Sequence, residues 1–211
     1  MPKDKFLERT RFLMNNKHSK LSIGIAVFFE IILITTAIFN IMSGQFKDLT
    51  LFPMAIVCII LPFIITRITN KKKIMLPSSF EFISVLFILL ALYFGEIMKV
   101  YTTFWWWDLF LHGMFGSYAV IIGLNLIQGI IVNEKNTTEQ RFTIFTLIFS
   151  FCFSITLGTL WEMVEFLADY FFKTDMANGG LEDTATDLLI KIFCAFITLI
   201  ICYHRKLKNK K

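Results

Sequence analysis

The stretch FWWWDLFLHGMFG, residues 104–116, places a carboxylate and an imidazole beside a row of tryptophans. Asp108 and His112 are four residues apart, a spacing that puts both side chains on one face of a helix. Tryptophan rings favour the interface between a membrane and water. Because a long apolar run follows, the pair is predicted to lie near the surface of a bilayer, where a membrane-spanning helix begins.

Two further acidic pairs have the same kind of spacing. Glu162 and Glu165 are three residues apart, and Asp183 and Asp187 are four apart. Each pair again shares one helix face. Charged side chains that face lipid are costly, so the three pairs are expected to face one another in a single acidic site. That predicted site contains Asp108, His112, Glu162, Glu165, Asp183 and Asp187.

So many carboxylates repel one another unless they take up protons or a cation neutralises them. Lys191 follows Asp187 by four residues on the same face and would supply one positive charge. Carboxylate oxygens with one imidazole suit a divalent metal ion: Mg²⁺, Mn²⁺, Ca²⁺ or Zn²⁺. All six residues of the site are therefore predicted metal ligands. The predicted catalytic residues are His112, Glu162, Glu165 and Asp187.

Some of these residues also suit a purely structural role. Asp108 and Asp183 stand where helices begin, and an acidic residue there caps the helix and stabilises its dipole. The other four lie beyond the caps, and ionisable residues inside membrane segments are candidates for function. The tryptophans at 105–107 and Trp161 are predicted to anchor helices at the interface; stacking on a substrate is the alternative.

The rest of the chain is strongly apolar. Of its 211 residues 56% are hydrophobic, and the mean hydropathy is +0.66. The apolar runs of about 20 residues match the length that crosses roughly 30 Å of hydrocarbon. The predicted fold class is therefore all-α, a polytopic bundle of membrane helices. The four cysteines lie in apolar runs without metal-type spacing, and they are interpreted as packing residues.

About six membrane-spanning helices are expected, within one transmembrane domain over residues 21–203. A basic N-terminus, 1–20, precedes this domain and a basic tail, 204–211, follows it. The expected spans cover about 21–42, 51–68, 79–100, 105–132, 141–172 and 183–203. The fifth is too long to cross the bilayer perpendicularly, so it must tilt, kink or emerge. Gly158 is a predicted point of bending or close packing there.

The basic residues predict the orientation of the bundle. They concentrate in the N-terminus, in the loops after the second and fourth spans, and in the tail. The other three loops hold one each: Lys47, Lys99 and Lys173. Because Lys and Arg stay inside, both termini are predicted to be cytoplasmic and the acidic site to lie at the outer face. The net charge of +5 thus reflects topology, and nucleic acid is not an expected partner.

The three acidic motifs occur in the order WWDLFLHGMFG, GTLWEMVEF, LEDTATDLLI. Over roughly residues 80–200 they resemble the motifs of the YjdF-like family of bacterial inner-membrane proteins. That family has Asp-x-x-x-His before a Gly, an aromatic residue before Glu-x-x-Glu, and Asp-Thr-x-x-Asp. The matching positions are Asp108, His112, Gly113, Trp161, Glu162, Glu165, Asp183, Thr184 and Asp187.

The chain is also distantly similar to VanZ-type membrane proteins, which share Asp-x-x-x-His and a later acidic pair. It departs from them by lacking a Gln in the second motif and an Arg before the third. The resemblance implies a multi-pass protein of the bacterial plasma (inner) membrane. It supplies no activity.

Three kinds of function fit such a site. One is metal-dependent hydrolysis or transfer on a lipid-linked substrate at the outer face. The alternative is a proton- or cation-coupled transporter, in which Glu30 and Glu96 would extend a relay of the same residues toward the cytoplasm. A structural or accessory membrane protein with a polar core is a third. The expected partners are the lipid bilayer and either a lipid-linked substrate or a small ion.

Two absences in the sequence weigh on these alternatives. It lacks the repeated, interrupted helices that favour a transporter. It also lacks a basic cluster in the predicted outer loops that could hold a phosphate, so the enzyme would need a metal for that task.

The predicted orientation can be tested with cysteines introduced at three loop positions. Replacements at Gln45 and Asn178 should react with an impermeant thiol reagent in intact cells, whereas one at Lys72 should not, because only the first two face outward. Labelling at 72 with protection at 45 and 178 would reverse the orientation and move the acidic site to the cytoplasmic side.

Overall fold

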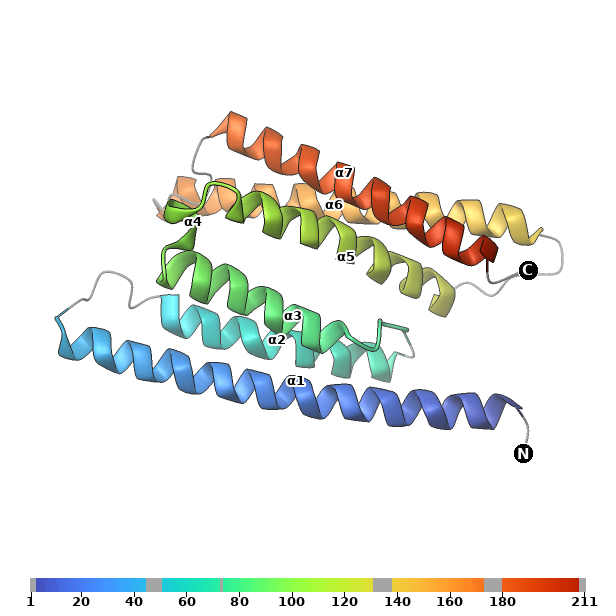
Figure 1. Ribbon diagram of the computed structural model, residues 1–211, viewed down its shortest axis with the longest axis horizontal. Coiled ribbons are helices and arrows are strands. Elements are labelled where there is room, and N and C mark those ends of the chain that lie inside the picture. Colours follow the sequence, from blue (N-terminus) through green and yellow to red (C-terminus); the bar gives the residue numbers. More distant parts are fainter. Residues whose placement is uncertain (1–2, 45–50, 73, 131–137, 173–179, 209–211) are drawn as a thin grey trace. The chain divides into compact units, whose positions relative to one another are not determined.

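The computed structural model describes residues 3–44, 51–72, 74–130, 138–172 and 180–208, and every regular element within these ranges is a helix (Figure 1). The expected all-α architecture is therefore confirmed. The chain divides into two compact units, residues 1–104 and 105–211. Positions 45 and 178, named above for labelling, lie outside the described residues.

Unit 1 is built on three helices that pack against one another: α1, α2 and α3. Helix α1 begins well before the first expected span, so the basic N-terminus, 1–20, is helical from Lys3 onward. A π-helix, η1, continues α3, and a short helix, α4, ends the unit. The bounds are Lys3–Met42 for α1, Leu51–Lys71 for α2, Phe80–Ile88 for α3, Leu89–Ile97 for η1 and Val100–Thr103 for α4.

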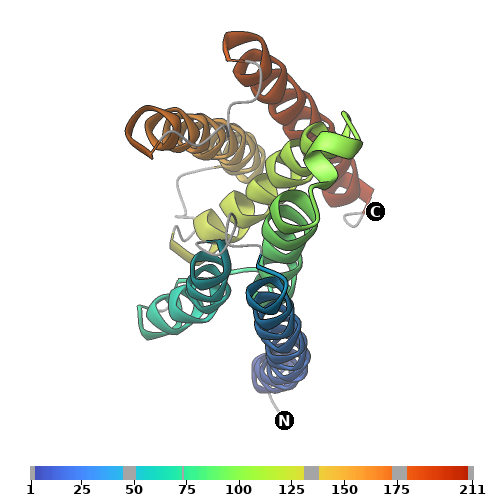
Figure 2. The ribbon, with the colours of Figure 1, turned by 90° about the vertical axis from the view of Figure 1, so that its left-hand side faces the viewer.

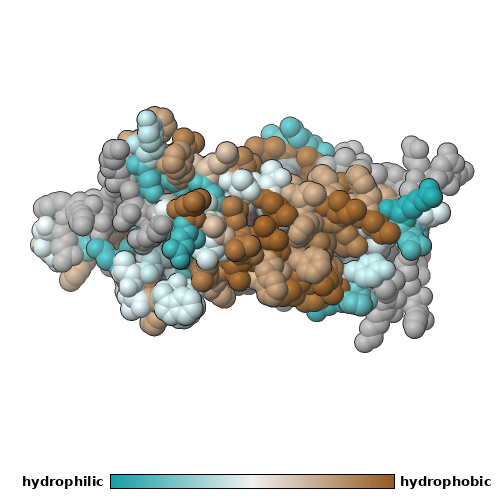
Figure 3. Space-filling view, turned by 90° about the horizontal axis from the view of Figure 1, so that it is seen from above, coloured by the Kyte–Doolittle hydropathy of each residue, from teal (hydrophilic) through white to brown (hydrophobic). Residues whose placement is uncertain are grey.

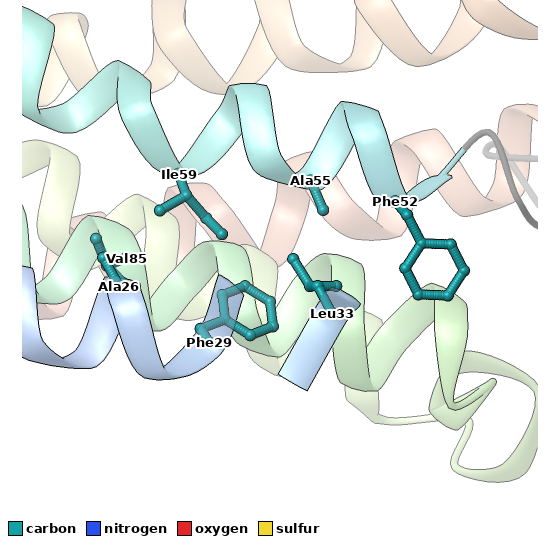
Figure 4. Packing of buried hydrophobic residues seen from close by; sticks show 7 residues of the cluster. All are labelled: Ala26, Phe29, Leu33, Phe52, Ala55, Ile59 and Val85. Atoms are coloured by element: carbon teal, nitrogen blue, oxygen red, sulfur yellow. The ribbon is translucent and has the colours of Figure 1, made fainter. Parts of the chain in front are cut away.

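The core of unit 1 forms where apolar stripes of these helices meet. Phe29 and Leu33 of α1 are fully buried beside Ala55 and Ile59 of α2, and Val85 of α3 completes the cluster (Figure 4). Each of the two pairs is spaced by four residues, which keeps its members on one helix face. The outward faces are apolar too, as expected for helices surrounded by lipid.

The third expected span changes its winding halfway along. Met98 donates its backbone N–H to the carbonyl of Tyr93 at 2.8 Å, the five-residue step of a π-helix. Lys99 then takes a left-handed conformation with φ of 57°, which ends the helix. At Gly95 a Cβ atom would collide with the ring of Tyr101, so a larger residue there would force this ring to move.

Unit 2 consists of α5, α6 and α7, and each of these helices packs against the other two (Figures 1 and 2). Their bounds are Trp107–Ile130, Glu139–Phe172 and Leu181–Lys208. Helix α6 is continuous over the fifth expected run and past Gly158. Because successive helices run in opposite directions, the start of α5, the end of α6 and the start of α7 meet at one end of the unit.

Small residues bring the helices of unit 2 unusually close together. A Cβ atom on Gly116 of α5 would lie 2.6 Å from the backbone oxygen of Lys191 on α7, and one on Gly123 would lie 2.9 Å from Cα of Ser150 on α6. Ser154 of α6 also donates a 2.8 Å hydrogen bond to the Gly116 carbonyl. Such contacts are typical of membrane helices, which associate through close packing and polar bonds.

Within the described ranges, five helical segments are long and apolar enough to cross a membrane: Lys20–Met42, Phe80–Ile97, Trp107–Ile127, Glu139–Phe171 and Leu181–Arg205. On the face drawn in Figure 3, hydrophobic side chains cover the middle and hydrophilic ones lie nearer the ends. Helix α2 occupies the position of the remaining expected span. The sixth crossing, the cytoplasmic placement of both termini and the single domain over 21–203 stay predictions.

The close approach of α5 and α7 predicts different outcomes for two Gly→Ala changes. Gly116→Ala should lower the free energy of unfolding by about 1–3 kcal/mol, because the new methyl group meets backbone that must shift. Gly24→Ala on α1 is the control, since no atom lies within 4 Å of a Cβ there. Thermal unfolding in detergent compares them, and equal midpoints would contradict the close packing.

Candidate functional site

Six polar side chains meet where α5 begins, α6 ends and α7 begins. Five of them are buried, and Asp108 is partly exposed. We call this group the His112 cluster. It comprises Asp108 and His112 from α5, Glu162 and Glu165 from α6, and Asp187 and Lys191 from α7.

His112 lies between carboxylates from all three helices. Its Nε2 atom is 3.1 Å from Oδ1 of Asp108 and 3.4 Å from Oδ2 of Asp187. Its Nδ1 atom is 3.7 Å from Oε1 of Glu162. The predicted approach of His112 to the acidic residues of α6 and α7 is therefore confirmed, whereas the catalytic roles assigned to these residues stay predictions.

Lys191 neutralises part of the negative charge, as its spacing from Asp187 predicts. Its ammonium group donates a short hydrogen bond to Oε1 of Glu162, and only 2% of the lysine is exposed. Two glycines lie against this residue. Gly116 lies against its backbone, and a Cβ atom on Gly158 would lie 3.0 Å from its Cδ. Gly158 is thus a point of close packing, one of the two roles expected for it.

Trp161 has a role that the sequence analysis missed. Its indole Nε1 donates a 2.6 Å hydrogen bond to Oε1 of Glu165. The ring is still partly exposed, so it can also serve as the expected interface anchor. The four-residue spacing between Trp161 and Glu165 is the signal that could have predicted this bond, because it places both side chains on one helix face.

Asp187 holds an oxygen that the described part of the chain leaves without a partner. The residue is only 1% exposed, and its Oδ1 atom is buried with no hydrogen bond among the described residues. A buried polar atom without a partner is costly and calls for an explanation. The whole cluster also holds four carboxylates against one ammonium group. An added proton or cation would satisfy Asp187 and reduce this excess charge.

In the part of the chain that the structure describes, two sets of three residues could hold a metal ion. Asp108, His112 and Asp187 form one set; His112, Glu162 and Glu165 form the other. Within each set the ligand atoms all lie within 4.8 Å of one another. Asp183, also a predicted ligand, belongs to neither set among the described residues; it lies in the first turn of α7, where it favours the helix dipole.

Two other acidic residues named in the sequence analysis belong to unit 1. Glu30 of α1 is half-buried and lines a cavity of about 180 Å³ between α1 and α2. Glu96 lies in η1 and is also half-buried. Their predicted role as extensions of a relay stays a prediction.

The apolar helices and their buried polar cluster define a multi-pass integral membrane protein. The chain belongs to the family described as "Predicted membrane protein (DUF2238)", which matches residues 24–208. It is also similar to an "Uncharacterized protein" of Thermotoga maritima, with 26% identity over 153 residues, which cover 69% of this chain and 71% of the relative. No solved structure matches the chain.

The family match confirms a membrane-protein family over most of the chain. The narrower likeness to YjdF-like and VanZ-type proteins rests on the three motifs and stays a prediction.

The buried ion pair predicts a large loss of stability when one partner is removed. Lys191→Met should destabilise the protein by about 3–5 kcal/mol, because it leaves the Glu162 carboxylate buried without its cation. The double variant Glu162→Gln with Lys191→Met should recover most of that loss. Glu182→Gln, at an exposed position of α7, is the control. Unfolding in detergent measures all four proteins; a harmless single variant would contradict the pairing.

Proposed function

We propose that the His112 cluster binds a divalent metal ion and hydrolyses or transfers part of a lipid-linked substrate at the outer face of the membrane. The single observation that carries the proposal is the buried, unpartnered Oδ1 atom of Asp187, beside an imidazole and the Asp108 carboxylate. A cation there would give this oxygen a partner.

Asp108, His112 and Asp187 are the proposed ligands. Both carboxylates lie within 3.4 Å of the same imidazole nitrogen, Nε2. Oxygen ligands with one imidazole nitrogen suit Mg²⁺, Mn²⁺ or Ca²⁺ and are compatible with Zn²⁺. The second set competes less well for the ion, because Glu162 already accepts a hydrogen bond from Lys191 and Glu165 accepts one from Trp161.

The remaining residues would position the ligands and move protons. Glu162 lies 3.7 Å from Nδ1 of His112, on the opposite side from the proposed ion, and would orient the imidazole ring. Lys191 fixes Glu162 in turn. Glu165, held by the Trp161 indole, is the proposed general base that would take a proton from the attacking water or alcohol. The bound metal would supply a Lewis acid for a phosphoryl or carbonyl oxygen.

The location supports a substrate that belongs to the membrane. Two exposed tryptophans, Trp105 and Trp106, directly precede α5, which carries Asp108 and His112, and tryptophans favour the level of lipid headgroups. A lipid-linked substrate would therefore present its polar group at the height of the carboxylates. Lys191 is the one lysine or arginine of the His112 cluster, and it is already bonded to Glu162. The metal ion would therefore be the group that holds a phosphate.

Proton or cation transport is a second candidate, favoured by the position of the imidazole between carboxylates on both ring nitrogens. A histidine placed this way can pass a proton from Glu162 to Asp187. Nearer the start of α6, however, the hydroxyl groups of three described residues donate hydrogen bonds to backbone carbonyls: Thr146, Ser150 and Ser154. These bonds favour a packing role for that stripe over a proton path.

Metal binding and lipid chemistry test the proposal together. Purified protein should bind Mn²⁺, measured by electron paramagnetic resonance, and Asp187→Asn or His112→Gln should weaken binding by at least about tenfold, since even residues that only orient ligands contribute that much. Glu182→Gln removes an exposed carboxylate from the same helix as the control. Lipid mass spectrometry should show a headgroup change in bacterial lipid vesicles that chelation and His112→Gln abolish.

A different result would favour the second candidate. If no divalent ion binds and no lipid changes, while sealed vesicles show proton or cation flux that His112→Gln removes, then the enzyme proposal is wrong and the relay replaces it.

A further inference from the structure

Unit 1 contains an open cavity at the end of α2, with Arg67, Asn70 and Lys71 exposed on its wall, that the proposed function does not use. Its volume is about 460 Å³. It is lined by five residues on one face of α2 and one residue of α3: Phe63, Thr66, Arg67, Asn70, Lys71 and Glu81. The spacing of the α2 residues by three and four places them along a single stripe, so one face of this helix forms most of the cavity wall.

The charged groups around this cavity are not paired with one another. Among the described residues no ion pair within 4 Å joins Arg67, Lys71 or Glu81 to any partner. Thr66, on the same stripe, has a hydroxyl oxygen that is buried without a hydrogen bond in the described part of the chain. The preference of Lys and Arg for the cytoplasmic side accounts only for the presence of Arg67 and Lys71 at this end of α2. It does not account for a carboxylate, an amide and a hydroxyl group lining the same cavity.

The position of the cavity indicates a ligand from the membrane. Arg67 is the first charged residue after the apolar part of α2, so the predicted second span places the cavity where that helix would leave the hydrocarbon. Phe63 forms its apolar wall, and the neighbouring Ile64 and Ile68 are exposed. A ligand with a charged head and apolar chains would contact both surfaces at once. Basic pockets between membrane helices bind anionic lipid headgroups on the cytoplasmic side, which is the side predicted for this end of α2.

The charges distinguish between lipid classes. Arg67 and Lys71 suit a phosphate, since guanidinium and ammonium groups both donate to phosphate oxygens. Glu81 would repel a second anionic group, and the C-terminal end of α2 adds partial negative charge. An ammonium group on the ligand would instead be attracted to Glu81. We propose that this cavity binds a phospholipid whose headgroup carries both a phosphate and a primary amine, as in phosphatidylethanolamine.

Native mass spectrometry of the purified full chain tests the lipid class. Three lipids with identical acyl chains are compared: phosphatidylethanolamine, phosphatidylcholine and phosphatidylglycerol. The first should bind at least about tenfold more tightly than the second, the difference expected for charge-assisted hydrogen bonds that a quaternary ammonium cannot donate. Equal binding of all three, or preference for the anionic phosphatidylglycerol, would overturn the assignment.

Variants then test each wall of the cavity. The double change Arg67→Gln with Lys71→Gln should weaken phosphatidylethanolamine by at least about tenfold through loss of the phosphate contacts. Glu81→Gln should retain phosphate-dependent binding but lose the preference for the amine. Arg141→Gln, an exposed basic residue at the start of α6, is the matched control and should change neither. An effect of Arg141→Gln equal to that of the double change would show a general charge effect and overturn the site.

Two measurements keep the test independent of folding and of the proposed activity. The charge-conserving change Arg67→Lys with Lys71→Arg should bind phosphatidylethanolamine like the original protein, whereas loss in both double variants would point to misfolding and contradict the proposed contacts. Soluble phosphoethanolamine should not displace the lipid at equal concentration; displacement would identify a free small molecule as the ligand. Neither readout depends on a metal or on chemistry at the His112 cluster.

Discussion

The ion pair between Glu162 and Lys191 is the interaction on which the organisation of unit 2 depends. Both groups are buried within helices that are apolar enough to span a membrane. A charge in such a place is tolerated only with a partner and with further hydrogen bonds. Meeting this condition requires α6 and α7 to lie side by side at one register. Glycines lie at both contacts with this lysine: Gly116 against its backbone and Gly158 against its side chain.

The same pair sets the electrostatics of the candidate site. With Glu162 held by the lysine, the histidine is left to share Asp108 and Asp187 on its other nitrogen. The imbalance of negative charge is thereby concentrated on the Nε2 side of the ring, where Asp187 keeps an oxygen without a partner among the described residues. A site with this asymmetry suits the capture of a cation better than a symmetric acidic patch would.

The sequence predicts much of this arrangement because the spacing of polar residues along a helix can be read from neighbouring positions alone. Spacings of three and four residues identify the faces that carry Asp108, His112, Glu162 and Asp187, and the cost of charge in lipid requires those faces to meet. Two features depend on contacts between distant segments and could not be predicted this way: the pairing of Lys191 with Glu162 and the close approach at Gly116. The change to a π-helix in the third span is local, but the apolar pattern there does not distinguish it from an α-helix.

The order of the two charges along the chain has a consequence for how the protein is made. Glu162 precedes Lys191 by 29 residues, so α6 leaves the ribosome before α7. A lysine at the centre of an isolated helix disfavours insertion by about 3 kcal/mol. Insertion of α7 into the bilayer is therefore favoured when α6 is already next to the translocon, because Glu162 can then pair with Lys191. The order of synthesis thus lets the earlier helix assist insertion of the later one.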